Sequence, residues 1–204
     1  MTKKIKLSKS MTENEFDNGY WYADEIKVFA KTIGIPSASK LRKDELEQLI
    51  KKFLRIGKVE KSKRKNIKKS GIKDLEKGLT LTLPIVNYTS NKKTKEFIIK
   101  EALKIVPGLK NKSGVWYRLN RWRDEQITKG INITYGDLVR QYINLNQVDG
   151  NFQKIPVGRY INFIADYLAN EKGSTRQQAI KSWKKLKELD IPKNYRAWKK
   201  YINK

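Results

Sequence analysis

The sequence predicts an all-α fold for this chain of 204 residues, and two observations carry the prediction. Apolar residues recur every three or four positions through most of the chain, which is the spacing of amphipathic helices, and glycines, prolines and short polar stretches interrupt them. One stretch, residues 79–83, alternates as a strand would. Because Pro84 follows it and no partner strand is evident, we expect only an extended segment there.

The most regular pattern lies in residues 20–54, which predict two helices. The first should end at Gly34, and the Ile-Pro pair that follows cannot continue a helix. Ser39 is a candidate N-cap, so the second helix should begin near Lys40 and end at Gly57. The expected buried stripes are Tyr22, Ile26, Phe29, Ala30 and Ile33 in the first helix and Leu46, Leu49, Ile50, Phe53 and Leu54 in the second.

The order of these parts resembles the SAP domain, a small helical DNA-binding module of chromatin and repair proteins. The matching features are the Gly-Ile-Pro turn at 34–36, Lys40 and the Glu-Leu pair at 45–46, within residues 20–56. Many SAP domains have glycine where residues 38–39 stand here, so the turn departs from the family pattern. The resemblance implies binding of AT-rich DNA. The rest of the chain is similar to small bacterial SAP-containing proteins of unassigned function, which implies no activity.

Positive charge at the start of the second helix points to the same function. Lys40, Arg42 and Lys43 are expected in its first turn, where the helix dipole disfavours cations. A phosphate bound there would contact these side chains and free backbone N–H groups, so we take Ser39 and the three cations as candidate DNA-binding residues. The alternative is that lysine is abundant everywhere in this chain and that the acidic residues at 44–45 offset the field.

The composition also favours a polyanionic partner. There are 46 Lys and Arg against 21 Asp and Glu, a formal net charge of +25 and a pI of about 10.0. Lysine outnumbers arginine, which favours phosphate contacts over base reading. An AT-rich genome would also produce a sequence rich in Lys, Ile and Asn. The competing hypothesis is therefore a protein-interaction adaptor whose helical surfaces bind an acidic partner.

Three parts follow from these patterns: a SAP-like module at 12–57, a basic linker at 58–78 and a helical domain at 79–204. Within the linker, hydrophobic periodicity is lost and positive charge is dense. Its central cations are further candidates for contact with a nucleic-acid backbone, with a solvated tether as the alternative. These candidates are Lys63, Arg64 and Lys65.

The C-terminal part contains two similar segments, which predict a duplicated helix–turn–helix unit. The segment from Thr134 to Tyr142 matches the segment from Thr175 to Trp183 at an offset of 41 residues. Each begins with a threonine followed three residues later by a residue that can complete a capping box. The corresponding pairs are Thr134 with Asp137 and Thr175 with Gln178, with Gly130 and Gly173 in the preceding turns.

Two features of this part suggest nucleic-acid contacts, and packing is the preferred interpretation of both. Arg176 and Gln177 stand where a recognition helix would read DNA, but the turns are longer than the three or four residues of that motif. Residues 115–123 interleave aromatic rings with arginines. We expect Trp122 in the core and leave the role of the arginines open.

The sequence offers little for catalysis. His and Cys are absent, which removes the commonest general base, the thiol nucleophile and imidazole metal ligands. Acidic residues come as adjacent pairs that point apart on a helix, and no Gly-rich phosphate loop is present. We therefore expect a non-catalytic protein without metal or cofactor. With no apolar run of membrane-spanning length and no secretory signal, we expect a cytoplasmic monomer without a membrane partner.

Overall fold

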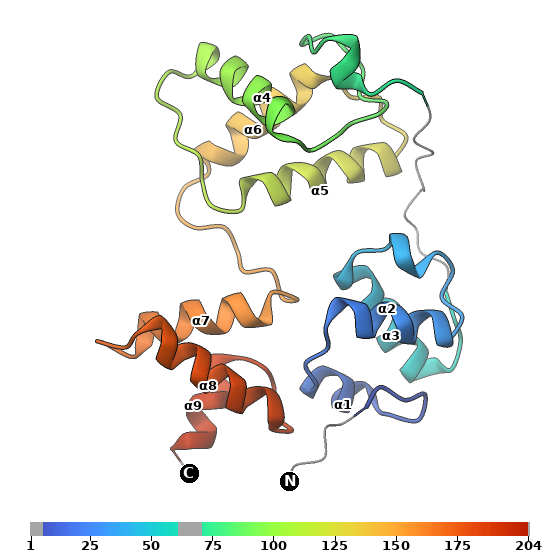
Figure 1. The fold of residues 1–204 in the computed structure, drawn as a ribbon, viewed down its shortest axis with the longest axis vertical. Helices are drawn as coiled ribbons and strands as arrows, with labels where there is room; N and C mark the ends of the chain where they lie inside the picture. The colour runs from blue at the N-terminus through green and yellow to red at the C-terminus, as the bar shows by residue number, and fades with distance from the viewer. Residues whose placement is uncertain (1–5, 61–70, 204) are drawn as a thin grey trace. The chain divides into compact units, whose positions relative to one another are not determined.

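A computed structural model describes residues 6–60 and 71–203 of the chain. Regular structure in this part is helical throughout, which confirms the all-α prediction (Figure 1). None of these helices is both long and apolar enough to cross a membrane. The elements in chain order are α1 (Glu13–Asn18), α2 (Ala23–Thr32), the 3₁₀ helix η1 (Ala38–Lys40), α3 (Lys43–Ile56), the 3₁₀ helix η2 (Asp74–Lys77), α4 (Lys92–Ile105), α5 (Val115–Thr128), α6 (Tyr135–Gln147), α7 (Arg159–Asn170), α8 (Arg176–Glu188) and α9 (Tyr195–Ile202).

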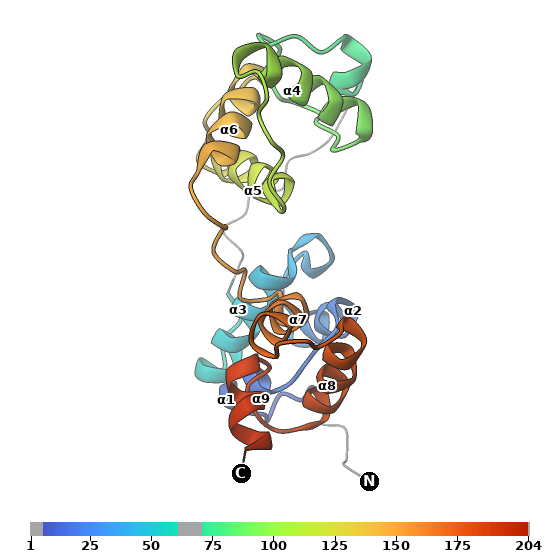
Figure 2. The ribbon, with the colours of Figure 1, turned by 90° about the vertical axis from the view of Figure 1, so that its left-hand side faces the viewer.

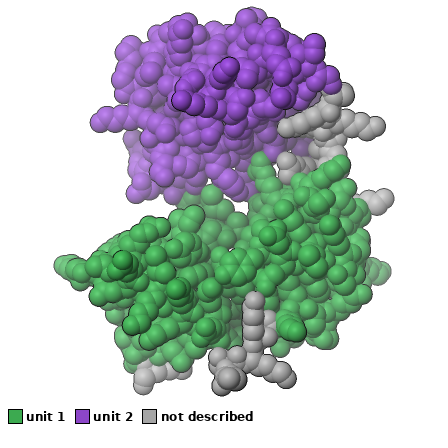
Figure 3. Space-filling model, viewed as in Figure 1, with its two compact units in different colours: residues 1–62, 153–204 green, residues 63–152 purple. Residues whose placement is uncertain are grey.

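The chain forms two compact units (Figure 3). Unit 1 contains residues 1–62 and 153–204, and unit 2 contains residues 63–152. This division differs from the domains expected from the sequence, which kept 79–204 together. Residues 153–204 instead pack with the N-terminal helices, through contacts between side chains far apart in the sequence that no local pattern reveals.

In unit 1, α2 ends as expected at Gly34, whose φ of 88° is the left-handed conformation that glycine favours. The Ile35 N–H donates to the Ala30 carbonyl at 2.8 Å, which completes a Schellman-type end. The helix α3 also ends as expected, at Gly57 with a φ of 70°. The sequence therefore placed both helix ends correctly.

The start of α3 differs from the prediction. Ser39 is not its N-cap, because Ser37 adopts a left-handed φ of 53° and starts the separate 3₁₀ turn η1. Within that turn the Lys40 N–H donates to the Ser37 carbonyl at 2.9 Å. The helix itself begins three residues later than expected, at Lys43, with Arg42 at the N-cap position.

The core of the module includes Trp21, which the spacing of apolar residues did not predict. Ile26, Leu46 and Ile50 are fully buried, as predicted. Tyr22, by contrast, is 50% exposed, because it precedes the first turn of α2. Trp21 is buried in its stead, and its indole N–H donates to the carbonyl of Phe16 in α1, a helix that the sequence did not predict, at 2.8 Å.

The helices α7, α8 and α9 form the second part of unit 1 around an aromatic core (Figure 2). Phe163 stands at its centre, with ring-centroid distances of 5.4 Å to Trp183 and 6.3 Å to Trp198. Tyr20, from the segment before α2, contacts Trp183 edge to face at 5.0 Å. Aromatic packing therefore joins the C-terminal helices to the SAP-like module.

In unit 2, α4 and α5 pack against α6 (Figures 1 and 2). The segment at 79–83, expected to be extended, contains a turn instead, in which the Leu83 N–H donates to the Thr80 carbonyl at 3.2 Å. Pairing with the segment before α6 follows the turn: the Ile85 N–H donates to the Ile133 carbonyl at 2.9 Å, and the Gly136 N–H donates to the Leu81 carbonyl at 2.7 Å. These bonds leave one isolated bridge and no strand in the described part of the chain. Trp122 is partly buried against the core of the unit, as expected.

Both predicted capping boxes are present. The Thr134 side chain accepts from the Asp137 N–H, and the Thr175 side chain accepts from the Gln178 N–H. The two helix pairs, α5 with α6 and α7 with α8, lie in different compact units. Their common origin by duplication remains a prediction.

Candidate nucleic-acid interface

The turn between α2 and α3 presents two of the expected DNA-binding residues to solvent. Ser39 and Lys40 are exposed, and the Lys40 ammonium forms no ion pair with another described residue. Ala38 beside them is buried and fixes the turn to the core of the module. Ser39 and Lys40 thus extend into solvent from a turn that Ala38 anchors in the core.

Arg42 lies next to this turn, at the start of α3. Its side chain is half-buried, and its backbone N–H donates to the Glu45 carboxylate at 2.7 Å. That carboxylate, together with Asp44, already places negative charge at the positive end of the helix. These carboxylates offset the positive end of the helix dipole at the start of α3.

Lys43 does not belong to the interface that the sequence predicted. Its ammonium is turned inward and donates to the Trp21 carbonyl at 2.7 Å, and it lies 3.7 Å from the Glu47 carboxylate. Burial lowers the pKa of Lys43, and the nearby Glu47 opposes that shift. The expectation that three cations gather at the helix start is corrected: Lys43 serves the fold, and the remaining candidates are the exposed Ser39 and Lys40 and the half-buried Arg42.

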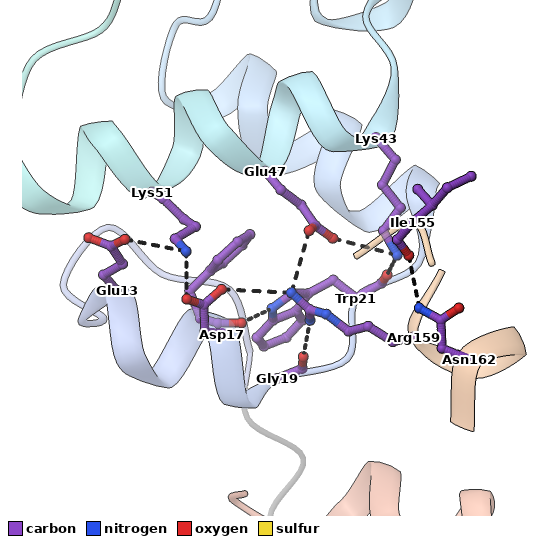
Figure 4. Close-up of polar contacts among 11 residues, drawn as sticks. Glu13, Asp17, Gly19, Trp21, Lys43, Glu47, Lys51, Ile155, Arg159 and Asn162 are labelled. Atoms are coloured by element: carbon purple, nitrogen blue, oxygen red, sulfur yellow. Dashed lines mark hydrogen bonds and ion pairs between the residues drawn. The ribbon is translucent and has the colours of Figure 1, made fainter. Parts of the chain in front are cut away.

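Lys43 is part of a larger charged group, which we call the Arg159 cluster (Figure 4). At its centre the Arg159 guanidinium of α7 donates to the Gly19 carbonyl at 2.7 Å. The same guanidinium lies 3.4 Å from the Glu47 carboxylate and 3.7 Å from the Asp17 carboxylate. Burial raises the pKa of Glu47, while Arg159 and Lys43 counteract that rise. The members are Glu13, Asp17, Lys43, Glu47, Lys51 and Arg159.

The geometry of the Arg159 cluster suits a structural role. Lys51 of α3 bridges two residues of α1, at 2.6 Å from the Asp17 carboxylate and 3.3 Å from Glu13. The hydrogen bond to Asp17 raises the pKa of Lys51, which stabilises its charged form. Each carboxylate is neutralised by a cation, and the cluster ties α7 to α1 and α3. The i, i+4 spacing of Lys43, Glu47 and Lys51 was a local signal of it in the sequence, and nothing there linked these residues to Arg159.

The remaining sequence candidates lie elsewhere. Lys63, Arg64 and Lys65 fall outside the described residues. The Arg118 guanidinium stacks 4.1 Å from the Phe152 ring, and Arg121 pairs with Glu125 at 3.3 Å, so both contact other parts of unit 2. These contacts give the two arginines roles in packing and surface pairing.

No cluster of three or more potential metal-ligating residues is found in residues 6–60 and 71–203. No protein-family model, curated protein or solved structure in our comparisons matches the chain.

Proposed function

We propose that this chain is a non-catalytic DNA-binding protein that holds double-stranded DNA mainly through phosphate contacts of its SAP-like module. The observation that carries the proposal is the turn at 37–42, which displays Ser39, Lys40 and Arg42 between two packed helices. A hydroxyl group and two cations at the end of a helix are groups that commonly contact phosphate. They position a duplex without reading its bases.

The overall charge supports this proposal. A chain with a formal net charge of +25 attracts phosphate backbones over a distance set by the ionic strength. The balance of charge also indicates the mode of binding. Lysine makes point contacts to phosphate and is poorer than arginine at bidentate base recognition, so we propose low sequence specificity with the preference for AT-rich duplexes that the SAP resemblance implies.

The test is a titration of fluorescent duplex DNA at several salt concentrations, with wild-type protein and the double variant Lys40→Ser/Arg42→Ser. We expect the slope of log K against log salt to become shallower by about 1.8 for two lost phosphate contacts. AT-rich and GC-rich duplexes of equal length should differ little in slope.

The matched control is Lys52→Ser/Arg55→Ser, which removes one lysine and one arginine near the other end of α3. These side chains form exposed ion pairs with Glu60 and Glu13, which contribute little to stability. The control should keep the wild-type slope. An unchanged slope in the turn variant would refute the assigned site, and the absence of salt-dependent duplex binding by the wild type would refute the function.

A second candidate function is an adaptor that binds a partner protein. One observation favours it: an open cavity of about 660 Å³ lies between the segment at 6–9 and α2, lined by Leu7, Trp21, Val28 and Phe29. Lys6 and Lys9 line it together with Asp24 and Glu25, so its charges balance and its apolar side chains would make most of the contact with a partner. An adaptor would bind DNA weakly, with no preference for duplex over single strand.

A further inference from the structure

The outer face of α8 carries a row of polar and basic residues, which we call the α8 stripe: Gln177, Lys181, Lys184 and Lys185. Their spacings of four, three and one place them on one side of the helix, and all four are exposed. The opposite side of α8 carries Ala179, Trp183 and Leu186, which are buried in the core. The helix therefore has one face committed to packing and one face, mostly cationic, turned to solvent.

The lysines of the α8 stripe contribute few contacts to the fold. None of the three ammonium groups forms an ion pair or hydrogen bond with another described residue, although Glu188 lies within one turn of Lys184 and Lys185. Lys181 and Lys185 stand four residues apart, and Lys181 and Lys184 three apart, where like charges repel. Because Lys185 lies in the last turn of α8, where the helix dipole favours a cation, the two effects oppose each other. The fold leaves three cations available to a ligand.

The stripe is held rigidly on the same compact unit as the turn. The capping box at the start of α8 includes a bond from the Thr175 N–H to the Gln178 side chain at 2.7 Å. Farther along the helix, Lys187 reaches across to the SAP-like module, where its ammonium donates to the Tyr22 hydroxyl at 3.1 Å. The capping box defines the start of α8, and the Lys187 bond joins its other end to the segment before α2.

We propose that the α8 stripe is a second DNA-contacting surface of unit 1, which binds the phosphate backbone of a duplex in addition to the turn at 37–42. The chemistry of the stripe favours phosphate as its ligand, because lysine ammonium groups are point charges that need no defined base edge. The proposal rests on the proposed function for the identity of its partner, but it depends on different residues.

The experiment compares the triple variant Lys181→Gln/Lys184→Gln/Lys185→Gln with the wild type in the same salt titration on a fluorescent duplex. The expected result is a slope shallower by roughly two to three and an affinity lower by roughly tenfold or more at low salt. The matched control is Lys77→Gln/Lys110→Gln/Lys129→Gln, which removes three exposed lysines of unit 2 and the same net charge. The control should retain most of the affinity.

A thermal measurement separates loss of binding from loss of fold. Because repulsion among the stripe lysines and the attraction of Lys185 to the helix C-terminus oppose each other, the triple variant should melt close to the wild-type temperature without DNA. The increase in melting temperature that saturating duplex DNA produces should be smaller for the variant than for the wild type. A variant that melts well below the wild type would show that the lysines serve the fold and would overturn the proposal.

The outcomes distinguish the two proposals. If the wild type binds duplex DNA and the stripe variant loses no more affinity than its control, the second surface is refuted while the turn stands. If the stripe variant loses affinity and the turn variant does not, the turn is the wrong site. If the stripe variant keeps its affinity for duplex DNA but loses affinity for single-stranded RNA in a parallel titration, the ligand of the stripe is RNA and the proposal is wrong. A wild type that does not bind duplex DNA refutes both.

Discussion

At the scale of single residues, Lys43 shows how tertiary contacts decide the role of a cation. The sequence places it beside Lys40 and Arg42, and nothing local distinguishes the three. In the structure the Lys43 ammonium contacts the Trp21 carbonyl and the buried carboxylate of Glu47. A buried ammonium needs such partners, because an unpaired buried charge is costly. Lys40 is exposed, and Arg42 is half-buried.

This contrast gives a prediction for Lys43→Met. The substitution keeps most of the apolar stem but leaves the Trp21 carbonyl without its ammonium donor, so the free energy of unfolding should fall by about 1–3 kcal/mol in urea denaturation. The slope of DNA affinity against salt should stay at the wild-type value. A slope shallower by about 0.9 with unchanged stability would return Lys43 to the interface.

At the scale of elements, local signals account for what the sequence predicted well. The ends of α2 and α3 follow from glycines that adopt left-handed conformations, and the starts of α6 and α8 follow from threonine caps. The start of α3 was misplaced because the left-handed Ser37 inserts a 3₁₀ turn, a conformation that serine seldom adopts. Local rules located ordinary helix ends and missed the unusual one.

The two caps can be tested in parallel. Thr134→Ala and Thr175→Ala should each lower the free energy of unfolding by about 1 kcal/mol, because each removes a side-chain acceptor from the first turn of a helix. Hydrogen exchange should show faster opening of the first turn of α6 in one variant and of α8 in the other. Replacement of either threonine by serine should preserve protection, and equal protection in the alanine variants would contradict the capping role.

At the scale of the whole molecule, the sequence could not reveal which segments pack together. Arg159 and Glu47 are 112 positions apart, and Arg159 and Gly19 are 140 apart. No periodicity links such residues, so the expected domain at 79–204 joined helices that belong to different compact units. The fold class and the ends of α2 and α3 were predictable from local patterns. The Arg159 cluster, and the packing of the C-terminal helices with the N-terminal helices in unit 1, could be seen only in the structure.

The ion pair between Arg159 and Glu47, which joins the two segments of unit 1, can be tested by a double-mutant cycle. Arg159→Met should lower the free energy of unfolding by about 3 kcal/mol, because it leaves the buried Glu47 carboxylate with a single, more distant cation. Adding Glu47→Leu should recover part of that loss, since the double variant buries no unpaired carboxylate. Strictly additive losses in urea denaturation would show that the two side chains are not coupled.

We propose that duplex DNA binds at the turn between α2 and α3. The most direct measurement is an NMR titration of ¹⁵N-labelled protein with a short duplex, in which backbone amide shifts are followed residue by residue. We predict the largest changes at residues 37–45, with a second group along α8 if the stripe also binds. Amides of the turn that stay unshifted while the duplex saturates the protein would contradict the claim.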